Sequence, residues 1–444
     1  MSEIASEFVR HLRDSADPAT RGWFVMSAGS MTRLAIGLIA SAIVARAFGP
    51  SNLGIYATLA AIAATTGAFC EFGLTESAVR RIASNWPRTP EAARATARSY
   101  LWLRLSASAI VVGLLLLALP LTSMFDVRLP RTSLVALALL GVVATGLCGA
   151  TNGILQATGR FGRLSLVLIT NAVLTAIAAI VLRLAGILTL PTALFVLGIG
   201  TSLICFEVGR RFLSGIVSFS YPGHQVLRNE GRALFGFGVW LWIGNSLAMG
   251  AAQLDLLLAA HWLTPVAVGT YALAVSLSSK ASVLNQSLHA ALLPFASSLR
   301  SKTAVRSYLR RGLLRSALIA LLLLLAMPLA RPVIPFIFGA NYTPSVSLFL
   351  ALLGVAITDL FAAPVLLLAF TVERPKLIAA ADAARLIALL VTALLLVPVL
   401  GASGLVFAKL AASLAGFALT VVALGWRSWL SSPEPQFLET ISER

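Results

Sequence analysis

Residues 48–57 read FGPSNLGIYA, and residues 263–272 read LTPVAVGTYA. Both stretches contain Pro-x-x-x-Gly-x-Tyr-Ala, and the second copy follows the first at an offset of 215 residues. Each copy joins two apolar segments. Pro ends one helix, Gly permits a close reversal, and Tyr suits the start of the next helix at a membrane interface. The repeated turn therefore predicts a chain that uses one pattern of helices twice.

The composition indicates that the chain folds in a lipid bilayer. Of its 444 residues, 58% are hydrophobic and 11% are charged, whereas a soluble domain has about 25% charged residues. The mean hydropathy is +0.90. Apolar stretches longer than about 18 residues recur along the chain, and each can cross a hydrocarbon core of ~30 Å. We therefore expect an all-α integral membrane protein.

Twelve apolar spans can be placed between the Pro, Gly and Arg residues that interrupt the hydrophobic pattern. They cover residues 23–47, 53–79, 99–121, 132–157, 164–184, 189–209, 233–260, 266–293, 312–335, 345–370, 377–398 and 401–426. A second echo, between TGRFGR (158–163) and TVERPK (371–376), follows spans 4 and 10 at an offset of 213. Six spans in each half predict two six-helix lobes that cross the membrane in the same direction. A pseudo-twofold axis along the membrane normal would relate them.

The predicted organisation has five parts. They are a cytoplasmic N-terminal arm (1–22), an N-lobe (23–213), a cytoplasmic linker (214–232), a C-lobe (233–427) and a cytoplasmic tail (428–444). The arm lacks the apolar region of a cleavable signal peptide, and either an amphipathic surface helix or a disordered tail is expected there.

The basic residues predict the orientation of the chain. Of the 34 Lys and Arg residues, 24 lie in the arm, the C-terminal end and the loops after even-numbered spans, and five lie in the other loops. Cytoplasmic loops carry such an excess. Both termini are therefore expected in the cytoplasm. The net charge of +17 indicates topology and contact with membrane lipids rather than nucleic-acid binding.

The remaining five basic residues lie inside predicted spans: Arg33, Arg104, Lys280, Arg385 and Lys409. A charge near the bilayer centre costs about 3 kcal/mol or more, so it usually faces a cavity or a partner. Arg33 and Lys280 lie near mid-depth, one in each half, and are the best candidates for cavity cations; pairing with a buried carboxylate is the alternative. Lys409, Arg385 and Arg104 are the further candidates for cavity cations. Lys409 and Arg104 lie closer to span ends, where the alternative is a long side chain that reaches water.

Three acidic residues are candidates for coupling transport to an ion gradient. Asp255 and Asp359 lie deep in spans 7 and 10 with no cation nearby in the sequence. Each is expected to bind H⁺ or Na⁺, or to pair with a mid-depth cation across helices. Asp382 precedes Arg385 by three residues on one helix face, so an i,i+3 ion pair accounts for both. The four His and three Cys show no metal-ligand spacing, and neither a metal nor an organic cofactor is expected.

Two stretches carry a resemblance to a known family. ARAFGPSNLGIYA (45–57), followed by EFGLTESAVRRIAS (71–84), resembles the opening of Wzx-type polysaccharide exporters, which belong to the MOP superfamily of multidrug, oligosaccharidyl-lipid and polysaccharide exporters. QLDLLLAAHWLTPVAVGTYALA (253–274) resembles the start of their second lobe. The resemblance covers about 23–427. Its loose Gly, Pro and Arg patterns identify the superfamily better than the substrate.

The resemblance implies a MATE-like V of two lobes with a central cavity that opens to each side in turn. It implies a flippase in the bacterial cytoplasmic (inner) membrane. Such a flippase moves undecaprenyl-pyrophosphate-linked oligosaccharide, a unit of O-antigen, capsule or exopolysaccharide, to the outer leaflet. It also implies coupling to Na⁺ or H⁺ and contact with other polysaccharide-assembly proteins.

Other functions remain open. A MATE-like drug exporter is the close alternative, although cavity cations would repel organic cations. A lipid II exporter of the superfamily typically has two further C-terminal spans, which the sequence does not show. A membrane polymerase or ligase usually needs acids or Arg in outer loops, and here the predicted outer loops are short, with Asp126 as their only carboxylate.

Overall fold

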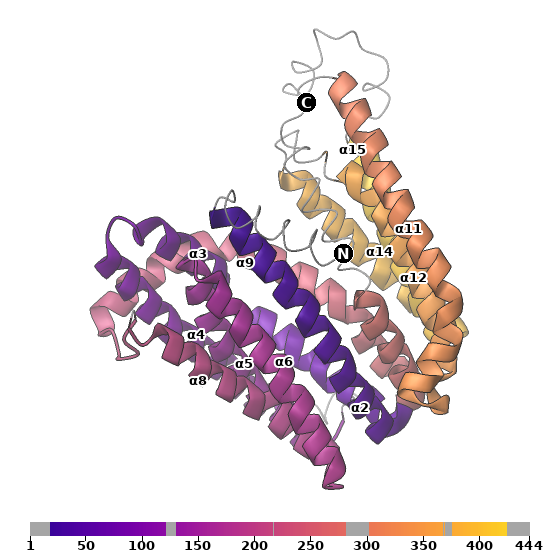
Figure 1. The fold of residues 1–444 in the computed structure, drawn as a ribbon, viewed down its shortest axis with the longest axis horizontal. Coiled ribbons are helices and arrows are strands. Elements are labelled where there is room, and N and C mark those ends of the chain that lie inside the picture. Colours follow the sequence, from indigo (N-terminus) through magenta and orange to yellow (C-terminus); the bar gives the residue numbers. More distant parts are fainter. Residues whose placement is uncertain are drawn as a thin grey trace, which may run out of the picture. The chain divides into compact units, whose positions relative to one another are not determined.

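The structure is a computed structural model, and it describes residues 18–120, 130–215, 217–280, 302–366, 368 and 375–423 (Figure 1). These residues are almost entirely helical, and no β-strand occurs among them. Unit 1 is formed by the described residues of Met1–Phe48 and Leu59–Ser246, and unit 2 by Gly49–Thr58 and the described residues of Leu247–Arg444. The segment predicted as a linker, 214–232, lies within unit 1, and the lobe boundaries stay a prediction.

Helix α2 (Pro18–Phe69) contains the first predicted span, the repeated turn and most of the second span. The helix kinks at Gly49, where φ is 65° and ψ is 174°, and Pro50 follows directly. Glycine adopts positive φ at little cost and proline cannot donate to the preceding turn, so this pair breaks the helical path. The second predicted span ends earlier than expected. A turn at 70–73 separates it from the short amphipathic helix α3 (Leu74–Asn85).

The two copies of the repeated turn pack against each other within unit 2. A Cβ on Gly54 would overlap the carbonyl oxygen of Pro265, and a Cβ on Gly269 would overlap that of Pro50. The contact is reciprocal, because each glycine faces the proline of the other copy. The chain thus repeats this pattern where two backbones approach more closely than any side chain permits.

Unit 1 is built around one central helix. The unit contains α3, α4 (Pro90–Ala118), α5 (Thr132–Ala157), α6 (Phe161–Leu184), α7 (Leu190–Ala193), the π-helical turn η2 (Leu194–Gly200), α8 (Thr201–Leu213) and the first part of α9 (His224–Trp262). Helix α5 packs against α3, α4, α6, α8 and η2. Its contact face is formed by small residues and aliphatic side chains, including Ala150, Gly153 and Ile154. Small residues allow the close helix packing that stabilises bundles in lipid.

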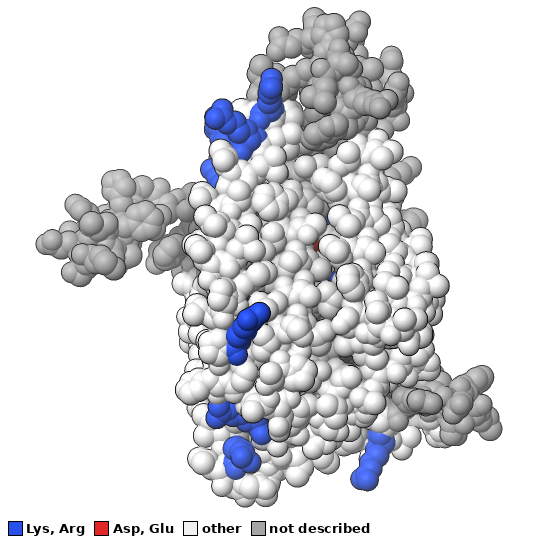
Figure 2. Space-filling model, turned by 90° about the vertical axis from the view of Figure 1, so that its right-hand side faces the viewer, with Lys and Arg blue, Asp and Glu red and all other residues white. Residues whose placement is uncertain are grey.

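Unit 2 places long apolar helices side by side. It contains the end of α9, a helix at 265–280, α11 (Lys302–Phe338), η3 (Ala340–Tyr342), α12 (Pro344–Leu366), α14 (Pro375–Leu400) and α15 (Ala402–Ala423). Helix α12 packs against α11 and α15, and α14 packs against α15. Helix α11 leaves Leu318, Leu322 and Leu325 exposed, as a lipid-facing helix does. Figure 2 shows a face of the molecule with few charged side chains and broad uncharged areas.

The membrane character of the chain follows from these helices. Within the described residues, nine helices are long and apolar enough to cross a membrane, and the first of them, Ala28–Phe69, includes most of the first two predicted spans. In each of the twelve predicted spans, the described residues are mainly helical. The protein is therefore a multi-pass, all-α membrane protein, while the count of twelve crossings stays a prediction.

Candidate functional site

A buried charged cluster in unit 2 joins three helices. Asp255 of α9 is 1% exposed, and its Oδ2 lies 2.7 Å from the Nζ of Lys409 on α15. The hydroxyl of Tyr271 donates to the same carboxylate oxygen at 2.7 Å. The other oxygen, Oδ1, has no hydrogen-bond partner among the described residues. The site is thus one ion pair with one tyrosine donor and one unsatisfied acceptor.

The cluster corrects two expectations from the sequence. Tyr271 is the tyrosine of the second repeated turn, and at 0% exposed it is not an interfacial anchor but the residue that orients Asp255. The sequence predicts that Lys409 faces the cavity or reaches water, whereas in the structure it forms an ion pair with Asp255. The carboxylate was expected to pair with a mid-depth cation if with any. Its partner instead comes from the last described helix.

Two further acidic residues of unit 2 are held by neighbours. Asp359 on α12 accepts a hydrogen bond from the hydroxyl of Ser413 on α15. Asp382 lies 3.4 Å from the Nη1 of Arg385 on α14, so the predicted i,i+3 ion pair is confirmed. Arg385 also lies against Gly416 of α15, where a Cβ would come within 2.9 Å of its Cδ.

Arg104 in unit 1 is buried rather than directed toward water. It is 8% exposed, and its Nε and Nη1 have no hydrogen-bond partner among the described residues. The guanidinium lies beside Gly146 of α5, where a Cβ would be 3.6 Å from the Arg104 Nε, an ordinary contact distance. The explanation that Arg104 lies near a span end and reaches water is therefore wrong. The side chain is a buried cation at the α4–α5 contact.

The two mid-depth cations have no carboxylate partner in the part of the chain that is described. Arg33 is an exposed side chain on α2, and Lys280 is half-buried at the last described residue of the helix 265–280. Neither forms an ion pair with any described residue. The alternative of a structural pair with a carboxylate therefore finds no support for either residue.

Sequence reasoning missed a polar node that connects α3, α4 and α9 in unit 1. Both carboxylate oxygens of Glu230 accept from the guanidinium of Arg81 at 3.0 Å, and Thr96 donates to one of them at 2.8 Å. The residues are 149 and 134 positions apart, so no local spacing could have revealed the contact. Among the described residues, no group of three His, Cys, Asp or Glu forms a metal-binding cluster.

Solved structures share this fold. A multidrug resistance transporter of the MATE family of the MOP superfamily, solved in an inward-facing conformation, is 16% identical with a TM-score of 0.66, over 90% of this chain and 96% of that one. The lipid II flippase MurJ, in an inward closed conformation, is 13% identical with a TM-score of 0.62, over 92% of this chain and 89% of that one. The chain therefore has the fold of the MOP-superfamily membrane transporters.

The sequence narrows this class further. Residues 19–300, more than half of the chain, match the model of the family described as polysaccharide biosynthesis protein, and the chain belongs to that family. No curated protein matches it. Family and fold together confirm the resemblance to Wzx-type exporters of the MOP superfamily.

Proposed function

We propose that the protein is a flippase that moves undecaprenyl-pyrophosphate-linked oligosaccharide from the inner to the outer leaflet by alternating access. The cargo would be a repeat unit of O-antigen, capsule or exopolysaccharide. Membership in the polysaccharide biosynthesis family supports this substrate class. The fold shared with transporters supports movement of a substrate rather than enzymatic chemistry.

The observation that carries the proposal is a set of cations that lie in apolar helices and have no carboxylate partner among the described residues. Arg33 and Arg104 in unit 1 and Lys280 in unit 2 form no ion pair with any described residue. A pyrophosphate leaving water loses hydration that only strong donors replace, and charged hydrogen bonds from Arg and Lys are the strongest available. Organic cations would be repelled by the same residues, which disfavours a drug exporter. A lipid II flippase is the second candidate, because MurJ shares the fold.

For ion coupling we propose Asp255, with Lys409 and Tyr271 as its partners. The carboxylate now holds Lys409 by charge attraction in surroundings with little water. A proton that reaches Asp255 removes the negative charge and with it this attraction. Lys409 then becomes a free cation inside the membrane, available to an anionic head group. Asp359 and Asp382, each held by one neighbour, are the further coupling candidates.

Reconstituted protein tests the substrate class directly. Proteoliposomes would contain a fluorescent undecaprenyl-pyrophosphate oligosaccharide, and an external quencher would report its movement between leaflets. Arg33→Gln and Lys280→Gln are each expected to slow flipping about tenfold or more, because each removes a charged hydrogen bond worth about 1.5–3 kcal/mol. The matched controls are Arg183→Gln and Arg331→Gln, which remove exposed arginines and should leave the rate within about twofold.

Two outcomes would overturn the proposal. Unchanged flipping in both Arg33→Gln and Lys280→Gln would remove the role of the cations. Transport of lipid II at a rate equal to or above that of the oligosaccharide would favour the second candidate.

The proposed location is the bacterial cytoplasmic membrane, with both termini in the cytoplasm and polysaccharide-assembly proteins as neighbours. Tags at the two termini should be protected from an external protease in intact cells. Cleavage of either tag before lysis would refute the orientation.

A further inference from the structure

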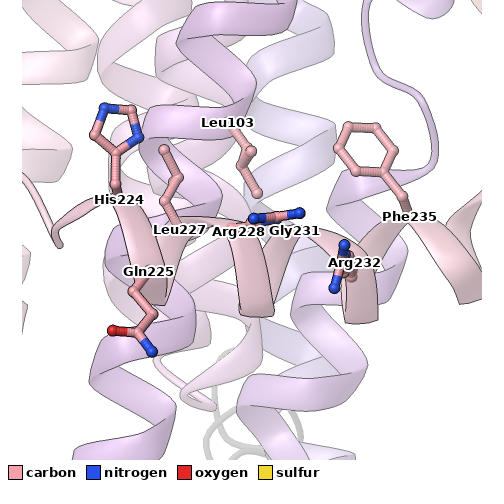
Figure 3. A pocket seen from close by; sticks show the side chains of 8 residues that line it. All are labelled: Leu103, His224, Gln225, Leu227, Arg228, Gly231, Arg232 and Phe235. Atoms are coloured by element: carbon pink, nitrogen blue, oxygen red, sulfur yellow. The ribbon is translucent and has the colours of Figure 1, made fainter.

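An open groove lies in unit 1 between α4 and the beginning of α9. Its volume is about 750 Å³. Leu103 of α4 forms one wall, and it points toward α9 between Leu227 and Phe235 (Figure 3). The two helices are close here, because a Cβ on Gly231 would lie 3.6 Å from a methyl group of Leu103, an ordinary contact distance. The groove thus has an apolar wall contributed by two helices.

The groove also has a cationic edge. His224, Arg228 and Arg232 line it at intervals of four residues, which places all three along one side of α9. No acidic side chain is among the lining residues. Glu230, the acid nearest to them along α9, is occupied by Arg81 and Thr96. Neither Arg228 nor Arg232 forms an ion pair with any described residue.

Aromatic residues next to the groove are of the kinds that gather at the depth of lipid headgroups. The ring of Tyr221 lies 5.4 Å from that of Trp102 and 5.8 Å from that of His224, edge to face in both cases. Tyr221 is 46% exposed and contacts His224, which lines the groove. Trp and Tyr gather at the boundary between hydrocarbon and water. A cationic edge beside an apolar wall at this depth matches both parts of a lipid.

We propose that this groove binds one anionic phospholipid. The phosphodiester lies against Arg228 and Arg232, and an acyl chain follows Leu103, Leu227 and Phe235. Basic pockets between transmembrane helices on the cytoplasmic side are suited to such headgroups, and the topology predicted from the basic residues puts this segment on that side. The site is independent of the transported substrate, because none of the intramembrane cations lines it.

Native mass spectrometry of the purified full-length protein tests the proposal. Phosphatidylglycerol, zwitterionic phosphatidylcholine and glycerol phosphate, which lacks acyl chains, would be titrated separately. One phosphatidylglycerol should bind at saturation, more tightly than either other compound. Arg228→Gln/Arg232→Gln should weaken it about thirtyfold, from about 1 kcal/mol for each basic residue and tenfold for each 1.4 kcal/mol.

The matched control removes the same charge elsewhere in unit 1. Arg88 and Arg94 are exposed and do not line the groove, so Arg88→Gln/Arg94→Gln should change the affinity by less than about threefold. Equal loss in the two double variants would show attraction to net charge and overturn the site. Equal binding of phosphatidylcholine would overturn the headgroup contact, and equal binding of glycerol phosphate would overturn the acyl wall.

Discussion

Replacing Gly54 by alanine should force apart the two copies of the repeated turn. The new Cβ would overlap the carbonyl oxygen of Pro265 and lie 2.8 Å from the nitrogen of Gly269, 0.6 Å short of the 3.4 Å at which ordinary contact begins. Both obstructing atoms belong to the backbone, so no side chain can rotate away. The helix at 265–280 itself must move.

The magnitude follows from two opposing terms. Overpacking costs about 1–3 kcal/mol, and the rigid backbone here favours the upper end. Alanine in place of glycine in a helix returns about 1 kcal/mol. The expected net loss in the free energy of unfolding is about 2 kcal/mol. In a region of the size of unit 2, this loss lowers the melting temperature by roughly 4–8 °C.

Thermal unfolding of the purified protein in detergent measures this loss. Gly37→Ala is the matched control, because Gly37 lies in the same helix and has no atom within 4 Å of the new Cβ. That variant should melt at the wild-type temperature or slightly above it. Gly54→Ala/Gly269→Ala should cost less than the sum of the single variants, since either change already opens the contact. Equal melting temperatures for Gly54→Ala and Gly37→Ala would refute the reasoning.

Two further substitutions separate structural from functional charges. Lys409→Gln should lower the free energy of unfolding by about 3–5 kcal/mol, because it leaves Asp255 buried and unpaired. Lys409→Gln/Asp255→Asn should recover most of that loss. Equal melting temperatures of the single and double variants would contradict the ion pair. Arg104→Gln should leave the melting temperature unchanged or higher, because it removes a buried charge with two unpartnered nitrogens, while flipping falls about tenfold. A clear loss of stability with normal flipping would make Arg104 structural.

The sequence predicts the helices well and their partners poorly. Apolar length located α5 at the residues where the structure has it, Thr132–Ala157. The predicted end of the second span is wrong, because the apolar pattern continues through the turn at 70–73. There Phe72 and Gly73 have φ of 48° and 65°. Gly73 was the sequence signal for a turn, but its apolar neighbours favoured a continuous span.

The site separates local from long-range information in the same way. The pair Asp382–Arg385 was predictable because both residues lie within one helical turn. The pair Asp255–Lys409 was not, because 154 residues separate its members and only the folded chain brings α9 and α15 together at this point. The prediction that Tyr271 lies at the membrane interface was wrong for a related reason. Its place after a turn is typical of an interfacial anchor, and only burial among other helices shows otherwise.

The two halves of the sequence are similar at the repeated turn but differ at the charged residues inside the predicted spans. At the offset of 215 residues, Asp255 corresponds to Ala40 and Lys409 to Leu194, so the first half has no equivalent of the ion pair. Arg33 corresponds to Ala248, which removes the equivalent cation from the second half. Charges inside apolar helices are costly, so the presence of Asp255, Lys409 and Arg33 without a counterpart needs a reason other than the repeated turn. The glycines account for the close contact between the two copies of the turn, and the unmatched charges are the residues that we propose to act in transport of an anion.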